Sequence, residues 1–121
     1  MTAKEEKLMG KKVSVLGVKY TIEFHETAED SQLEAGACGY CDNTAKIIVA
    51  ASRDENCEVI YWDKKTNEIL RHELVHAFLY EGGLDACVQN EEQGVSEMFV
   101  DWVAIQFPKL FKAYSDLDIL D

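Results

Sequence analysis

Two of the chain's three histidines lie next to a glutamate in residues 68–83, EILRHELVHAFLYEGG, a stretch rich in aliphatic residues. His72 and His76 are four residues apart, so on a helix they lie one turn apart and can direct their ring nitrogens at one point. Zinc accepts neutral imidazole, and a catalytic zinc site uses three protein ligands and one open position. Glu73, roughly 100° round the helix from His72, lies beside that open position, where a carboxylate acts as a general base. The spacing therefore predicts a metal site on a helix.

The apolar neighbours of the motif argue against a chance match. They surround the helix almost completely, so we expect both histidines in a buried helix rather than on a solvated face. Buried polar groups need partners, and a shared metal ion would supply one. The alternative is a pair of core histidines that form hydrogen bonds. The apolar neighbours are Ile69, Leu70, Leu74, Val75, Ala77, Phe78 and Leu79.

A second apolar stretch, SEMFVDWVAIQF at residues 96–107, carries two carboxylates four residues apart. On a helix, Glu97 and Asp101 share one face, and we expect Glu97 to be the third metal ligand. Asp101 is placed to accept the far ring N–H of a ligating histidine, which fixes its tautomer and orientation. The alternative for Glu97 is a partly exposed carboxylate stabilised by the helix dipole. The remaining histidine, His25, lies in a polar stretch and is a poor candidate for a ligand.

Strand patterns occupy the first half of the chain. Apolar residues alternate with polar ones on both sides of Gly17, which predicts two strands joined by a glycine turn. Residues 36–51 predict a second hairpin, because Asp42, Asn43 and Thr44 favour a tight turn. Residues 25–36 fit a loop or a short helix, and residues 59–62 fit either a strand or the start of a helix.

Helix patterns occupy the second half. One helix is expected from about Thr66 to Glu81, ending at two glycines. Another is expected from Asn90 to about Phe107, because proline at position 108 disfavours helix at the residue before it, and a short helix follows at 108–114. Strands followed by helices predict an α+β fold in which a small antiparallel sheet packs on the helices. Residues 1–10 are expected to be a flexible leader, and residues 11–121 a single domain.

The net charge limits the class of ligand. Twelve Lys and Arg residues against 23 Asp and Glu residues give −11, which disfavours binding to a nucleic-acid backbone. An acidic protein of this size could instead mimic DNA. We find no secretory signal and no apolar run long enough to cross a membrane, so we expect a cytoplasmic protein with reduced cysteines. The CGYC stretch at residues 38–41 fits a structural zinc or redox motif, but no second CxxC follows, and we interpret its cysteines as strand residues.

The two chemical stretches together resemble a known enzyme family. HELVH at residues 72–76 and EMFVD at residues 97–101, with twenty residues between His76 and Glu97, resemble the HExxH and ExxxD pair of the gluzincin metallopeptidases. The phrase HELVHAFLYEGGL looks most similar to the small cytoplasmic and phage-encoded zinc peptidases of the ImmA/IrrE type. The resemblance implies a minimal zincin-like domain and one zinc ion per chain.

Family membership would also assign roles to individual residues. The resemblance implies His72, His76 and Glu97 as ligands, Glu73 as general base and Asp101 as a residue that orients a ligand. It further implies an edge strand that pairs with an extended peptide substrate, for which residues 36–51 are the candidate. Further substrate or oxyanion contacts could come from Tyr40, Tyr61, Tyr80 or His25, among which the sequence does not choose.

The sequence therefore predicts a zinc-dependent metallopeptidase that acts on a peptide or protein, with no direct nucleic-acid or membrane partner. Two other hypotheses stay open. One is a non-catalytic interaction module that holds the same zinc. The other is an acidic DNA mimic, or antirepressor, that acts by stoichiometric binding.

Overall fold

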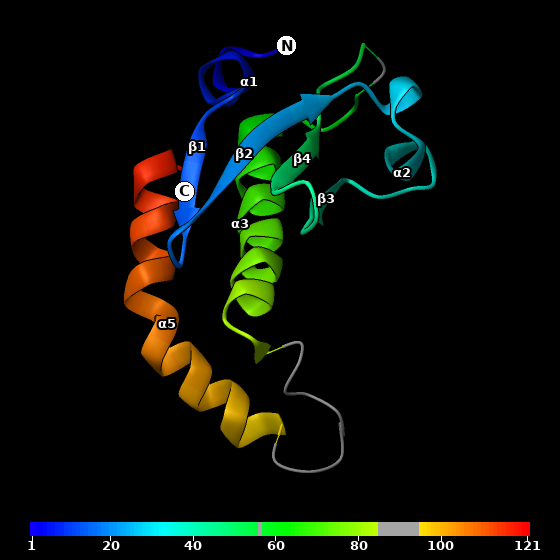
Figure 1. The fold of residues 1–121 in the computed structure, drawn as a ribbon. Coiled ribbons are helices and arrows are strands. Elements are labelled where there is room, and N and C mark those ends of the chain that lie inside the picture. Colours follow the sequence, from blue (N-terminus) through cyan, green and yellow to red (C-terminus); the bar gives the residue numbers. More distant parts are fainter. Residues whose placement is uncertain (56, 85–94) are drawn as a thin grey trace.

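The computed structural model describes residues 1–55, 57–84 and 95–121, while the side chains of residues 95–101 and 104 lie outside the description. A four-stranded sheet lies against one long helix, α3 (Trp62–Glu81), and a second long helix, α5 (Val95–Leu117), runs beside strand β1 (Figure 1). The expected α+β class is confirmed. Among the helices of the described residues, none combines the length and the apolar character that a membrane span requires.

The first hairpin forms as the alternation predicts. Strands β1 (Lys12–Val15) and β2 (Val18–His25) pair antiparallel, with Val15 opposite Val18. The two residues between them, Leu16 and Gly17, have φ values of 51° and 90°, which is the positive pair that a type I′ hairpin turn requires. Tyr20, Ile22 and Phe24 therefore all point into the core.

The second hairpin also forms, but its position makes the sheet mixed. Strands β3 (Gly39–Asp42) and β4 (Ile47–Ala51) pair antiparallel, whereas β4 pairs parallel with β2, giving the order β1-β2-β4-β3. The prediction of a wholly antiparallel sheet is therefore wrong. Between β2 and β3 the chain forms a 3-10 turn, η1 (Thr27–Glu29), and a short helix, α2 (Ser31–Glu34). This connection carries the chain to the outer edge, so that β4 returns between β2 and β3.

The long helices differ from their predicted bounds. Helix α3 starts at Trp62 rather than Thr66. Residues 59–61 therefore lead into the helix and form no strand. The helix ends at Glu81, shortly before Gly83, which has a φ of 78°. The predicted start at Asn90 lies outside the described residues.

The predicted helix end before Pro108 is wrong, because α5 continues through the proline to Leu117. A proline inside a helix removes one hydrogen bond and favours a bend, and Figure 1 shows α5 bending in its middle. Ala113 and Leu117 are buried in the core beyond the bend, which offsets the cost of the proline.

Part of the segment expected to be a flexible leader forms a short helix that packs on the domain. Helix α1 (Ala3–Leu8) begins with a capping box, in which Thr2 and Glu5 each satisfy a backbone N–H of the other. Glu5 is fully buried and also accepts the backbone N–H of Arg53 at 3.1 Å, and Leu8 joins the core. The Thr-x-x-Glu pattern is the sequence signal for this helix.

The core lies between one face of the sheet and helices α3 and α5. Strands β1, β2 and β4 contribute alternating residues, and α3 contributes one stripe of its surface. A smaller cluster on the opposite face joins Leu33 of α2 to Val49 and Ala51 of β4, with Tyr40 packed against it. The main members of the core are Val13, Val15, Tyr20, Ile22, Phe24, Ile48, Ile69, Leu70, Leu74, Ala77, Phe78, Leu117 and Ile119.

Gly39 lies where β3 comes close to α3. A Cβ atom there would lie 2.6 Å from Ile69 Cγ2 and 2.7 Å from the backbone oxygen of Val49. We predict that Gly39→Ala lowers the free energy of unfolding by about 1 to 3 kcal/mol, because the strand and the helix must separate. Urea unfolding measures this, with the exposed turn substitution Ala45→Ser as a control that stays close to the parent. Equal stability of Gly39→Ala and the parent would contradict the close approach.

Candidate metal centre

The buried stripe of α3 contains one ionisable residue. Glu73 has 8 % of its surface exposed and lies among residues that face the sheet. His72 and His76 flank it and are exposed, so the expectation that both histidines are buried is wrong. Only one side of α3 packs on the sheet, and the histidines lie at the border of that side. The residues of the stripe are Thr66, Asn67, Ile69, Leu70, Glu73, Leu74, Ala77 and Phe78.

The three residues of the motif converge. The Nε2 atoms of His72 and His76 lie 3.3 Å apart, and their rings meet edge to face with centroids 5.0 Å apart. Together with Glu73, each residue offers one ligand atom within 4.8 Å of the others. Two nitrogens bound at about 2.05 Å to a tetrahedral zinc ion would be separated by about 3.3 Å. The two imidazoles therefore have the chemistry and the spacing of a pair of zinc ligands.

Burial controls the electrostatics of Glu73. Removal from water raises the pKa of its carboxyl, and the neighbouring imidazoles of His72 and His76 lower it, with a net upward shift. Within the part of the chain that the structure describes, the carboxylate of Glu73 forms no hydrogen bond. A buried carboxylate in this state is costly unless a ligand pairs with it.

Strand β3 forms the wall opposite the histidines. Gly39 contacts Ile69, and the charge of Glu73 acts on the thiol of Cys41; burial first, and then this charge, raises the pKa of Cys41 to about 12. Between the start of β3 and α3 lies a cavity of about 290 Å³ that reaches two residues of the motif. It is lined by Ala37, Cys38, Gly39, Lys65, Glu68, Ile69, His72 and Glu73.

The outer edge of β3 is paired with no strand of the described residues. Among the described strands, β3 pairs only with β4. The backbone N–H of Ala51 donates to the carbonyl oxygen of Cys38, so the antiparallel alternation directs the backbone groups of Gly39 and Cys41 away from β4. This edge can accept one more extended strand beside the histidines.

Two predicted site residues, Tyr40 and His25, are not brought to the metal centre. Gly39 and Cys41 face α3, so Tyr40 between them points to the opposite face, where its hydroxyl donates to Asp30 at 2.6 Å. His25 lies in the same network, with Nδ1 2.6 Å from Asp30 and Nε2 2.8 Å from Glu23. Strand alternation is the reason that neither residue can contact a substrate at His72.

Tyr80 remains next to the centre. It lies one turn beyond His76 on α3, is about half exposed, and has the ammonium of Lys46 4.9 Å from its ring centroid. Lys46 also pairs with Glu81 at 2.9 Å, and Tyr20 donates to the same carboxylate at 2.9 Å. Sequence reasoning missed this cluster, because its members are far apart along the chain and no local pattern connects them.

The remaining predicted residues are placed only in part. Glu97 and Asp101 lie on α5 one turn apart, but their side chains are outside the described residues. Tyr61 precedes α3 and is exposed.

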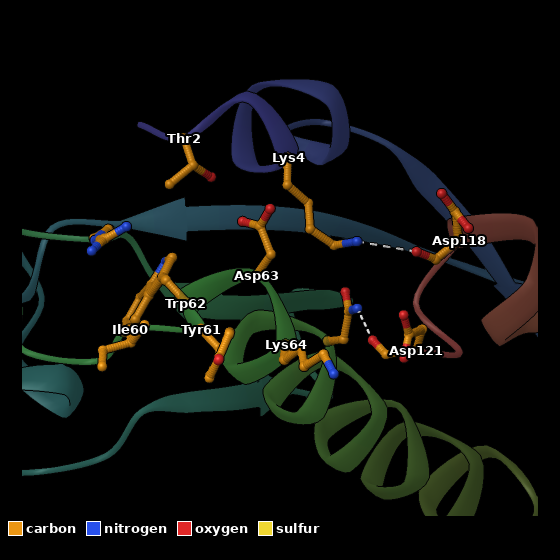
Figure 2. A pocket seen from close by; sticks show the side chains of 11 residues that line it. Thr2, Lys4, Ile60, Tyr61, Trp62, Asp63, Lys64, Asp118 and Asp121 are labelled. Atoms are coloured by element: carbon orange, nitrogen blue, oxygen red, sulfur yellow. Dashed lines mark hydrogen bonds between the residues drawn. The ribbon is translucent and has the colours of Figure 1, made fainter.

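A larger cavity, of about 610 Å³, lies at the start of α3 (Figure 2). Lys4 of α1 donates there to the backbone oxygen of Asp118 at 3.2 Å. Trp62 in its wall and His72 are ten residues apart on one helix, a separation of about 15 Å along the axis. Its basic and acidic residues balance, so the cavity defines no class of ligand. These residues are Lys4, Arg53, Lys64, Asp63, Asp118 and Asp121.

Comparisons of this chain with models of protein families, with curated proteins and with solved structures find no match. The cluster of His72, Glu73 and His76 is therefore the observation on which a functional assignment depends.

The network around His25 predicts a pH dependence of stability. Burial alone would lower the pKa of His25, but its bonds to Asp30 and Glu23 outweigh burial and raise it. The charged imidazole can donate to both carboxylates, whereas the neutral ring can donate to only one. A raised pKa in the folded state means that this stabilisation is complete below about pH 6.5 and is lost as the pH rises through the folded value.

We predict that His25→Gln destabilises the fold by on the order of 1 kcal/mol at pH 5.5, and by less at pH 9. Urea unfolding of parent and variant at both pH values measures the difference. The control Glu29→Gln removes a neighbouring exposed carboxyl. It should leave the change in unfolding free energy between pH 5.5 and pH 9 the same as in the parent. If the difference in unfolding free energy between the parent and His25→Gln grew as the pH rises, the assignment of a charged His25 would be contradicted.

Proposed function

We propose that this chain is a zinc-dependent metallopeptidase of the gluzincin type with a minimal zincin-like domain. The observation that carries the proposal is the convergence of His72, Glu73 and His76 within 4.8 Å, beside a strand edge and a cavity. Two imidazoles at the spacing of zinc ligands, together with a buried carboxylate, match the parts that metal-assisted hydrolysis requires.

Zinc would be held by His72, His76 and Glu97, one ion per chain. Asp101 would accept the far ring N–H of one ligating histidine. When bound, the ion would supply Lewis-acid chemistry, because it acidifies water and polarises a carbonyl group. Glu97 and Asp101 enter this assignment from the spacing of the sequence motif alone.

Glu73 would be the general base. Its carboxylate would take a proton from water as the oxygen attacks the peptide carbonyl, and would pass the proton to the leaving amine when the C–N bond breaks. Burial raises the pKa of Glu73. A higher pKa makes it a better base than an exposed glutamate, which supports this role.

The substrate would be a peptide in extended conformation. The outward backbone groups of Gly39 and Cys41 would pair with it, as in strand addition to a sheet edge. Tyr80, one turn beyond His76, would contact the substrate on the far side from the cavity.

A catalytic zinc is favoured over a purely structural one. Structural zinc sites are closed by four protein ligands, whereas a catalytic site keeps one position open. Exposed histidines, a carboxylate without a hydrogen bond to any described residue and an adjoining cavity suit the open kind.

We predict one zinc ion per chain, with unequal roles for the two carboxylates of α5. Glu97→Ala should weaken zinc binding severely, because a ligand is lost. Asp101→Ala should weaken it only about 10- to 100-fold, because the ligands remain. Elemental analysis of protein purified without chelators gives the stoichiometry, and a competition titration with a zinc chelator ranks the variants. Protein without stoichiometric metal would refute the proposal, and the reverse ranking would exchange the two roles.

Glu73→Gln separates catalysis from metal binding. The amide keeps the shape of the side chain and leaves all three proposed ligands, but it cannot take a proton. We predict retained zinc and a loss of peptide hydrolysis of on the order of 10² to 10⁴. Zinc analysis and hydrolysis of a peptide mixture, followed by mass spectrometry, measure both.

The same assay has two informative failures. Unchanged hydrolysis in Glu73→Gln would remove Glu73 as the base. Loss of zinc in this variant would make Glu73 a ligand and the site structural. His72→Ala serves as the control that loses both metal and activity. If a folded His72→Ala protein kept the biological effect of the parent, stoichiometric binding by an acidic DNA mimic would be favoured instead.

A further inference from the structure

Tyr80 lies on the side of α3 that carries the motif. Tyr80 and Glu73 are seven residues apart on one helix, so they lie within about 20° of each other round its axis and about 10 Å apart along it. His76 lies between them, one turn before Tyr80. An extended peptide rises about 3.4 Å per residue, so three residues span the distance from Glu73 to Tyr80. A peptide bound beside His76 therefore reaches Tyr80.

Strand β3 follows α3 over the same stretch. Its start lies close to Ile69, because a Cβ atom at Gly39 would be 2.6 Å from Ile69 Cγ2. Its end leads into the turn before β4, and Lys46 of this turn lies against the ring of Tyr80. Ile69 and Tyr80 are about 16 Å apart along the axis of α3. The edge strand thus runs from the cavity beside Ile69 to Tyr80.

A small network holds the ammonium of Lys46 beside Tyr80. Its Nζ lies 4.9 Å from the ring centroid of Tyr80 and 2.9 Å from a carboxylate oxygen of Glu81. The side chain of Glu81 is largely buried and also accepts the hydroxyl of Tyr20 at 2.9 Å. The bond from Lys46, followed by the bond from Tyr20, lowers the pKa of Glu81 against the effect of burial. The charged carboxylate therefore keeps the ammonium in place.

The backbone of Lys46 is also fixed. The side chain of Asp42 accepts the backbone N–H groups of Thr44 and Ala45, both at 3.0 Å, and the N–H of Lys46 donates to the carbonyl oxygen of Asp42 at 2.8 Å. Lys46 has a φ of 60°, in the left-handed region that a lysine seldom adopts. Such a conformation persists only where the surrounding contacts hold it. The side chain of Lys46 thus extends from a well-defined turn.

The hydroxyl of Tyr80 is the polar group that this network leaves available. Lys46 lies near two tyrosine rings, since its Nζ is also 5.6 Å from the ring centroid of Tyr20. Tyr20 is buried and its hydroxyl is bonded to Glu81, whereas Tyr80 is about half exposed. Within residues 1–55, 57–84 and 95–121, the hydroxyl of Tyr80 has no hydrogen-bond partner. Tyr80 therefore combines a restrained ring with a hydroxyl that can donate or accept.

We propose that Lys46 is a positioning residue for peptide hydrolysis, because its contact with the ring of Tyr80 holds the hydroxyl where it bonds to the backbone of the extended substrate. This inference rests on the proposed peptidase function. A cation over an aromatic face is attracted by the ring, and a ring that is already ordered loses less freedom when substrate binds. The bond forms with bound substrate and is retained in the transition state, so it lowers KM and leaves kcat unchanged. Lys46 itself touches no reacting atom.

The test uses the peptide that the parent cleaves fastest in the mixture assay. Hydrolysis gives kcat and KM, and calorimetry gives the Kd of the same peptide for zinc-loaded Glu73→Gln. Lys46→Met keeps the length of the side chain and removes its charge, so it should raise KM and Kd about 3- to 10-fold, with kcat and zinc content unchanged. Lys46→Arg keeps a cation and should restore most of the binding. The control Lys19→Met removes an exposed lysine of β2 and should match the parent.

A double-mutant cycle separates positioning from a purely structural role. Tyr80→Phe keeps the ring and removes the hydroxyl, so its KM should rise at least as much as that of Lys46→Met. Because Lys46 acts through this hydroxyl, adding Lys46→Met to Tyr80→Phe should raise KM no further. A lysine with only a structural role would raise KM equally in both backgrounds. Urea unfolding of each variant shows whether a change in KM follows a change in stability.

Three results would overturn the role of Lys46 and leave the peptidase assignment standing. These are equal effects of Lys46→Met with and without the hydroxyl of Tyr80, an unchanged KM in Tyr80→Phe, and a Lys46→Arg variant that binds as weakly as Lys46→Met. Tyr80→Phe changes an exposed residue, so it decides the question even where Lys46→Met does not fold. A zinc-loaded parent that hydrolyses no peptide would refute the peptidase assignment and this inference together.

Discussion

The packing of α3 on the sheet fixes how the three converging residues of the candidate metal centre are presented. Leu70, Leu74 and Phe78 are almost fully buried, so the rotation of the helix about its axis is determined by its apolar stripe. That rotation places Glu73 toward the sheet and the two histidines at the border. A shift of the stripe by one residue would turn the helix by about 100° and bring a histidine into the core. The burial of Glu73 is thus imposed by the hydrophobic packing around it.

The order of the strands determines what faces the centre. Because β4 returns between β2 and β3, the short strand β3 becomes the edge of the sheet among the described strands, and it packs against α3. The other face of β3 is fixed by Tyr40, whose hydroxyl bonds to Asp30; this carboxylate also accepts the backbone N–H groups that cap α2. The bonds from Tyr40 and then from His25 keep the pKa of Asp30 at about 2. The charged carboxylate of Asp30 thus holds β3 in place from the sheet face opposite α3.

Local patterns predicted local structure. The alternation around Gly17, the turn after Asp42 and the end of α3 at Gly82 and Gly83 all depend on neighbours in sequence, and each is present. The order of the strands depends on how a connection crosses the sheet, which alternation does not encode. Pro108 disfavours a helix locally, but burial of Ala113 and Leu117 outweighs it. The motif identified the three converging residues of α3. It did not predict that the histidines are exposed or that Tyr40 points to the sheet face opposite α3, because both depend on how the helix and the strand are oriented in the fold.

Burial and the neighbouring imidazoles shift the pKa of Glu73 in opposite directions. Burial raises the pKa of Glu73, while the nearby imidazoles lower it, and a bound cation would lower it further. An exposed carboxylate in the same place would feel only the lowering effects and would be a weaker base. Cys41 contributes by remaining neutral, because a pKa of about 12 keeps its thiol protonated near pH 7. The neutral thiol therefore contributes an apolar surface next to Glu73 and no second negative charge. The position of Glu73 in the buried stripe of α3 is what keeps its pKa raised.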